Sequence, residues 1–79
     1  MSESLNAPNR FAVCIRNPGY EAALERNKIY VVVFDIVAER KGDLRVIDES
    51  GDDFLYPAEW FVPIDVPEAV ESSLLLKRA

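Results

Sequence analysis

The chain has 79 residues, which suffice for one small domain, and its 49% hydrophobic content is typical of a globular protein. Its 9 basic and 14 acidic residues give a net charge of −5, which argues against sequence-independent binding to nucleic acid. A single cysteine and the absence of histidine exclude an internal disulfide and the usual zinc ligand sets.

The sequence shows neither a membrane-spanning segment nor a secretory signal. No apolar run approaches the roughly 20 residues that cross a bilayer, and residues 1–10 lack the basic and apolar regions of a secretory signal. We therefore expect a cytoplasmic protein with no membrane partner.

The amino-terminal third predicts a tail, a strand and a long loop. Residues 1–10 are expected to form a flexible tail, and Phe11–Arg16 is apolar enough for a first strand. Asn17-Pro18-Gly19 ends that strand, because Pro18 disfavours a helical conformation at Asn17 and Gly19 allows a turn. The segment Tyr20–Asn27 is too short for a stable helix, so we predict an excursion whose Leu24 returns to the core.

The clearest strand signal follows at Lys28–Ile36. Its apolar residues alternate between two faces, with Ile29, Val31 and Val33 on one and Tyr30, Val32, Phe34 and Ile36 on the other. Apolar residues on both faces predict a central strand covered on both sides. The polar segment Ala38–Asp43 is expected to be a loop.

The segment Leu44–Ile64 predicts strand, tight turn, strand, helical turn and strand. Gly51 can take the positive φ of a tight turn. A two-residue turn would pair Ile47 with Phe54, and a three-residue turn with a bulge would pair Val46 with Phe54. The sequence leaves both registers open.

Two prolines mark the elements that follow. Pro57 removes a ladder donor and suits the start of a helical turn that ends at Trp60, after which Phe61–Ile64 resumes as a strand. Pro67–Arg78 predicts a helix with charges that suit its dipole. Its apolar stripe consists of Val66, Val70 and Leu74, and residues 67–79 are expected to dock on the preceding domain.

This order of elements resembles the Src-homology-3-like barrel. Leu24–Val33 occupies the position of the second strand of that family, and Tyr56–Phe61 resembles the helical turn before its last strand. The resemblance covers residues 11–66 and implies a small all-β, five-stranded barrel with a short carboxyl-terminal α-helix. That family binds proline-rich peptides with an aromatic pair at the end of its first strand and a tryptophan at the start of its third. At these positions this chain has Cys14-Ile15-Arg16 and Leu44-Arg45. The run Arg45–Pro57 also resembles small bacterial proteins of unassigned function.

The acidic run Asp48–Asp53 partly matches a calcium-binding loop. Asp53 stands where that loop requires glycine, and its flanks predict strands rather than helices. We therefore expect no metal site and interpret the run as a solvated acidic turn.

No catalytic group or cofactor site is predicted. Without histidine, a nucleophile such as Cys14 or Ser50 lacks its usual base. Cys14 lies within an apolar strand, where a buried and inert thiol is expected. The three glycines are scattered and form no phosphate-binding loop. The protein is thus expected not to be an enzyme.

The aromatic residues are the remaining candidates for a site. Packing in the core and at its rim is the first interpretation of Tyr20, Tyr56, Trp60 and Phe61. A shallow groove that binds a protein partner is the second, with Tyr20, Tyr56, Pro57 and Trp60 as its candidate residues.

Three functions are compatible with these features. The first is a non-catalytic protein-interaction module, monomeric in solution. The second is a structural or assembly subunit that dimerises through the carboxyl-terminal helix. The third is an acidic mimic of nucleic acid, since residues 46–76 carry eight acidic and no basic side chains.

Overall fold

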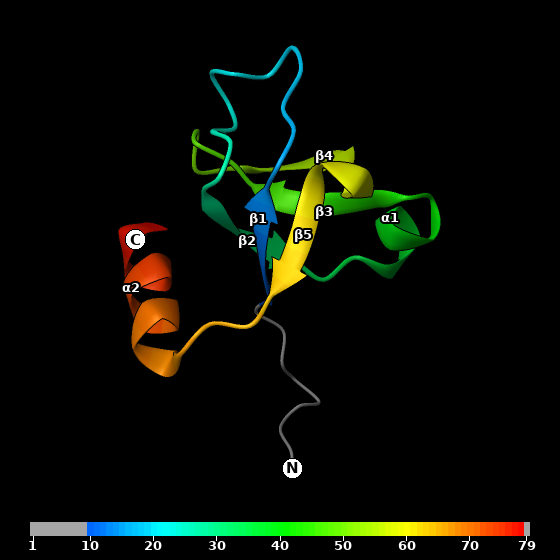
Figure 1. The fold of residues 1–79 in the computed structure, drawn as a ribbon. Coiled ribbons are helices and arrows are strands. Elements are labelled where there is room, and N and C mark those ends of the chain that lie inside the picture. The colour runs from blue at the N-terminus through cyan, green and yellow to red at the C-terminus, as the bar shows by residue number, and fades with distance from the viewer. Residues whose placement is uncertain (1–9, 79) are drawn as a thin grey trace.

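The computed structural model describes residues 10–78, which form one five-stranded antiparallel sheet and short helices (Figure 1). The elements in chain order are β1 (Arg10–Cys14), β2 (Ile29–Val33), α1 (Ile36–Arg40), β3 (Asp43–Ile47), β4 (Asp53–Pro57), the 3₁₀ turn η2 (Ala58–Trp60), β5 (Phe61–Ile64) and α2 (Glu68–Arg78). The predicted five strands and terminal helix are confirmed. Arg10, assigned to the tail from sequence, opens β1, and the rest of the predicted tail lies outside the described residues.

The sheet has the strand order β4-β3-β2-β1-β5 and is strongly curved. In a flat sheet the two outer strands would lie ~19 Å apart. Here they are joined only by the three residues of η2, and the four residue steps from Pro57 to Phe61 span at most about 14 Å. The sheet must therefore curl to bring its edges together, although β4 and β5 do not pair and the sheet is not closed.

Each face of the sheet carries its own hydrophobic cluster. The larger cluster lies on the concave face and takes residues from every strand: Ala12, Cys14, Leu24, Tyr30, Val32, Val46, Tyr56, Trp60 and Phe61. The smaller one lies on the other face around Phe11, Val31 and Ile47. The alternation in β2 explains both, since Tyr30 and Val32 face one cluster and Val31 faces the other. The predicted double burial of this strand is confirmed.

The strand is shorter than predicted, because helix α1 begins where the pattern Lys28–Ile36 was expected to continue. Asp35 adopts an extended conformation, and its Oδ1 accepts a hydrogen bond from the Ala38 N–H at 3.0 Å. This is an N-cap, which starts a helix by satisfying a free backbone donor. The predictions of strand through Ile36 and of loop from Ala38 are therefore wrong.

The β3–β4 turn adopts the longer of the two possible registers. Val46 pairs with Phe54 and Ile47 with Asp53, which leaves a three-residue turn closed by the Asp48 N–H on the Asp52 carbonyl at 3.1 Å. Gly51 has φ +91°, a conformation that side chains other than glycine rarely adopt.

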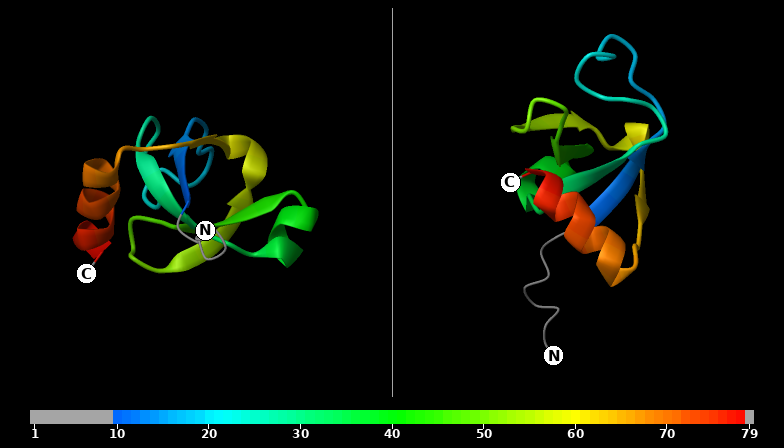
Figure 2. Two further views of the ribbon diagram at one scale, coloured as in Figure 1. Left: turned by 90° about the horizontal axis from the view of Figure 1, so that it is seen from below. Right: turned by 90° about the vertical axis from the view of Figure 1, so that its left-hand side faces the viewer.

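Helix α2 lies against the second face of the sheet, at the opposite side of the molecule from α1 (Figure 2). Val66, Leu74 and Leu75 pack against the smaller cluster. Val70, a member of the predicted stripe, is 37% exposed, so the stripe is corrected to include Leu75 instead. None of the helices within residues 10–78 is long and apolar enough to cross a membrane.

Candidate partner-binding surface

Three aromatic rings from distant segments meet at one end of the larger core. The Tyr20 ring lies 5.5 Å from that of Tyr56, nearly perpendicular to it, and 5.6 Å from that of Trp60. The Tyr56 and Trp60 rings are 6.2 Å apart. These separations are typical of favourable aromatic contacts. We call these three residues the aromatic cluster.

Tyr20 is placed by the long loop between β1 and β2. Within this loop the Tyr20 N–H donates to the Asn17 carbonyl at 2.8 Å, and the Tyr20 carbonyl accepts from the Leu24 N–H at 2.9 Å. The Asn17 side chain in turn donates to the Leu24 carbonyl at 2.8 Å. Leu24 is fully buried, as predicted, and fixes the loop to the core. The loop therefore presents Tyr20 from a defined backbone position.

The hydroxyl group of Tyr56 is hydrogen-bonded to the buried carboxylate of Asp48. The Tyr56 hydroxyl donates to Asp48 Oδ2 at 2.6 Å, and Asp48 Oδ1 accepts from the Ser50 N–H at 2.9 Å and the Ser50 hydroxyl at 2.6 Å. Burial raises the pKa of the Asp48 carboxyl, but the bonds from Ser50 and Tyr56 outweigh it and bring the net pKa below its usual value. Burial and the Asp48 carboxylate raise the pKa of the Tyr56 hydroxyl.

A second carboxylate ties the β3–β4 turn to the β1–β2 loop. Glu49 Oε2 accepts from the Tyr30 hydroxyl at 2.5 Å and from Lys28 Nζ at 2.7 Å, and the Glu49 N–H donates to the Ala23 carbonyl at 2.9 Å. The Tyr30 hydroxyl also accepts from the Glu25 N–H at 2.7 Å. Burial, and then the Glu49 bond, raise the pKa of Tyr30. In Figure 1 the two loops accordingly lie side by side.

The prediction of a solvated acidic turn is therefore wrong for Asp48, whereas Glu49, Asp52 and Asp53 are exposed. Asp48 is only 6% exposed and serves as the acceptor that holds Tyr56 and Ser50. The sequence could not predict which of the four acidic residues would be buried, because the register of the turn decides which side chain faces the core. Among the described residues, no group of three potential ligands is arranged to hold a metal ion.

The four candidate residues differ in how far their side chains are exposed to solvent. Tyr56 and Trp60 are 5% and 8% exposed, whereas Tyr20 is 51% exposed and Pro57 is half-buried. Phe61, the other member of the predicted aromatic set, is buried, and the centre of its ring lies 6.3 Å from that of Tyr56. Tyr20 is thus the most exposed ring of the aromatic cluster, and the buried rings of Tyr56 and Trp60 lie against it.

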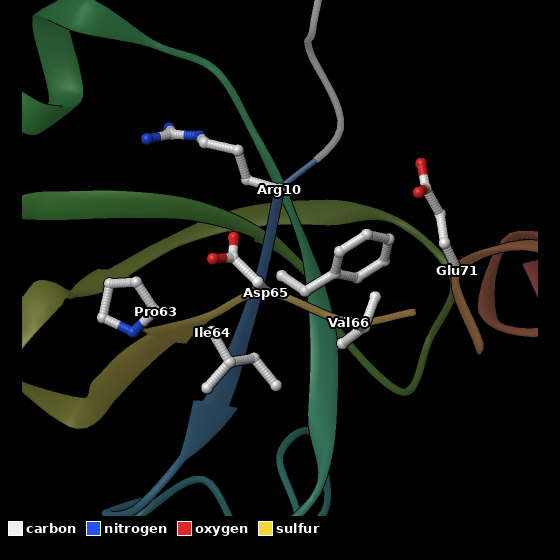
Figure 3. Close-up of a pocket in the computed structure, with 7 residues that line it drawn as sticks. Arg10, Pro63, Ile64, Asp65, Val66 and Glu71 are labelled. Atoms are coloured by element: carbon white, nitrogen blue, oxygen red, sulfur yellow. The ribbon is translucent and has the colours of Figure 1, made fainter. Parts of the chain in front are cut away.

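A cavity of about 380 Å³ lies elsewhere, between β5, Arg10 and the start of α2 (Figure 3). Its charged side chains do not converge: Arg10 and Glu71 point in different directions, and Arg10 pairs with Glu39 outside the cavity. Arg10 also lies over the Phe34 ring, 5.5 Å from its centre. The cavity therefore offers no set of groups aimed at one ligand.

Cys14 is fully buried, as predicted. Its Sγ donates to the Arg16 carbonyl at 3.3 Å, and burial raises the pKa of the thiol. A thiol held in the protonated state is a poor nucleophile.

No protein-family profile, curated protein or solved structure matches this chain.

The lowered pKa of Asp48 predicts an acid-dependent contribution to stability. A carboxyl with a depressed folded pKa stabilises the fold above its unfolded pKa of ~3.9, and this contribution is lost as the pH falls through the folded pKa. At pH 7, we expect Asp48→Asn to lower the free energy of unfolding by about 1–3 kcal/mol. The difference from the wild type should shrink at pH 3, as measured by urea denaturation.

Asp65→Asn, on the exposed linker before α2, controls for the loss of one carboxylate. A destabilisation by Asp48→Asn that is equal at pH 7 and pH 3 would show that the charge of Asp48 does not contribute.

Proposed function

We propose that the protein is a non-catalytic protein-interaction module built on a Src-homology-3-like barrel. It binds an exposed segment of another protein across Tyr20 and Pro57, above the buried Tyr56 and Trp60. The observation that carries this proposal is the half-exposed Tyr20 ring, which an ordered loop places against two buried rings, edge-on to Tyr56 and tilted to Trp60.

The barrel assignment is supported by topology. The first and last strands pair with each other, the long loop follows the first strand, and a 3₁₀ turn joins the fourth strand to the fifth. The curved sheet and its single concave core agree with a small, partly open barrel.

The proposed binding surface is supported by the exposure of Tyr20, which reduces the stability of the free protein. A large ring left half in water gives up part of the stabilisation that burial supplies, yet the loop that carries it is anchored by Leu24 and by several hydrogen bonds. Tyrosine is also enriched among the residues that dominate binding energy at interfaces. A partly exposed tyrosine on an anchored loop suits a shallow contact with a peptide or a loop.

The alternative of an assembly subunit rests on α2. Leu74 and Leu75 of the helix and Val66 of its linker already pack on the chain's own sheet, and Val70 is left 37% exposed. This leaves little apolar surface on the described part of α2 for a second subunit, so we favour a monomer. The third possibility, an acidic mimic of nucleic acid, has the acidic surface as its only support.

Tyr20→Ala tests the proposal. The purified protein would be immobilised and exposed to a lysate of its source organism, and captured proteins would be identified by mass spectrometry. We expect a partner that the wild type captures and that Tyr20→Ala loses, with a roughly thirtyfold weaker affinity as for a dominant interface residue.

Phe34→Ala is the matched control, because Phe34 is 60% exposed and lies outside the aromatic cluster. It should capture the partner as the wild type does. Equal capture by Tyr20→Ala and the wild type would contradict the proposed surface.

A further inference from the structure

The outer edge of β4 is a strand edge without a partner strand. β4 ends the sheet and pairs with β3 alone. At one end of this pair the Ala58 N–H donates to the Gly42 carbonyl at 2.9 Å, and at the other the Asp48 N–H donates to the Asp52 carbonyl at 3.1 Å. Ladder bonds of an antiparallel pair fall on every second residue. The even-numbered residues of β4 therefore bond to β3, and the odd-numbered ones direct their backbone groups outward.

The outward groups are the N–H and C=O of Asp53 and Leu55 and the C=O of Pro57. Within residues 10–78 no hydrogen bond satisfies the two N–H groups. The strand also leaves apolar side chains in water, since Phe54 is 49% and Leu55 is 47% exposed. These features are those of an edge that can accept another strand.

The opposite edge of the sheet differs in this respect. β5 has Pro63 at its centre, paired with Ala12. A proline on an edge strand has no N–H to offer and blocks strand addition. Only the β4 edge therefore combines free donors with exposed apolar side chains.

The charge around β4 indicates what kind of strand would bind. Asp52 and Glu59 are exposed at its two ends and form no ion pair within the described part of the chain. Arg45, which lies opposite Leu55 in the β3–β4 ladder, is already engaged by Asp35 at 2.8 Å and by Asp53 at 3.2 Å. A second copy of the chain would bring another such acidic edge and a net charge of −5, so it is a poor occupant.

We propose that the outer edge of β4 binds an extended, lysine- or arginine-rich segment of another protein as a sixth, antiparallel strand. The segment would bond to Asp53 and Leu55 through its backbone, cover Phe54 and Leu55, and place its cations near Asp52 and Glu59. This goes beyond the proposed function, because it uses the backbone of β4 rather than the aromatic cluster.

The test uses the peptide acetyl-Lys-Val-Lys-Val-Lys-Val-Lys-amide and its counterpart with glutamate at every lysine. Titrations would be followed by the amide ¹H–¹⁵N resonances of the full-length protein. We expect the largest shifts, and new protection from hydrogen exchange, at the N–H groups of Asp53 and Leu55. The lysine peptide should bind at least tenfold more tightly than the glutamate peptide.

Two variants and a modified peptide locate the contact. Leu55→Pro removes an outward donor and should weaken binding tenfold or more, while the ladder to β3 is left in place. Asp52→Lys should weaken binding about two- to fivefold, the range of an exposed ion pair. Glu68→Lys, the same charge change on α2, should have a smaller effect. If Leu55→Pro does not fold, the lysine peptide N-methylated at all seven residues, which has no backbone N–H to donate along either edge, should fail to bind.

Three results would overturn the proposal. One is the absence of shifts at Asp53 and Leu55 at millimolar lysine peptide, and another is a set of shifts confined to the aromatic cluster. The third is a concentration-dependent dimer that protects the same two N–H groups without peptide, since the occupant would then be a second copy.

Discussion

Replacing Trp60 with alanine is expected to lower the free energy of unfolding by about 3–5 kcal/mol, the usual cost of removing a large aromatic side chain from a core. Trp60 is 8% exposed and belongs to the larger cluster, where its ring contacts those of Tyr20 and Tyr56. A domain of this size has a total stability of roughly 5–15 kcal/mol. The variant should therefore unfold at a much lower concentration of urea.

Phe34→Ala controls for the loss of an aromatic ring at an exposed position and should cost less than about 1 kcal/mol. If Trp60→Ala and Phe34→Ala destabilised the protein equally, Trp60 would not support the aromatic cluster.

Leu24→Ala is expected to cost about 2–5 kcal/mol and to loosen the β1–β2 loop. Leu24 is the single fully buried side chain of that loop, whose neighbouring residues are mostly exposed. Its removal leaves a cavity and frees the backbone that holds Tyr20. Amide hydrogen exchange should therefore accelerate at Tyr20, Ala23 and Leu24 more than in the strands.

Glu25→Ala is the control, because it changes the neighbouring exposed side chain and retains the backbone N–H that bonds to Tyr30. A Leu24→Ala protein with wild-type stability and unchanged exchange in the loop would refute the anchoring role.

Local patterns in the sequence were sufficient for the five strands, the helical turn and the carboxyl-terminal helix. Alternating apolar residues in β2, the prolines at positions 57 and 67 and the glycine at position 51 each act within a few residues of their own position. They predicted β2 as a central strand, η2, α2 and the site of the hairpin turn. The burial of Leu24, the one large aliphatic residue of Tyr20–Asn27, was also predicted.

The missed features depend on distant contacts or on one capping bond. Helix α1 starts because Asp35 caps it and Arg45 holds the Asp35 carboxylate from β3, ten residues away. The apolar alternation that predicted a longer strand carries no information about this contact. Asp48 is buried because the three-residue turn directs it to Tyr56, and the sequence left that register open.

The residues of the aromatic cluster were predicted from the sequence, but their arrangement was not. The residue types indicated a site, and Tyr56 and Trp60 lie close in sequence. Tyr20 lies more than thirty residues away, and its contact with both requires the curl of the sheet and the anchored loop. Which of the rings would be exposed was not accessible from composition, because all are large and apolar.

Trp60 fluorescence offers the most direct test of the proposed binding surface, because Trp60 is the only tryptophan in the chain and lies 5.6 Å from Tyr20. The partner segment identified by capture, prepared without tryptophan, would be titrated into the protein while the emission is recorded. We predict a saturable change in emission for the wild type and for Phe34→Ala, and none for Tyr20→Ala over the same concentrations. Binding of equal affinity by Tyr20→Ala, or binding that leaves the Trp60 emission of the wild type unchanged, would contradict the account.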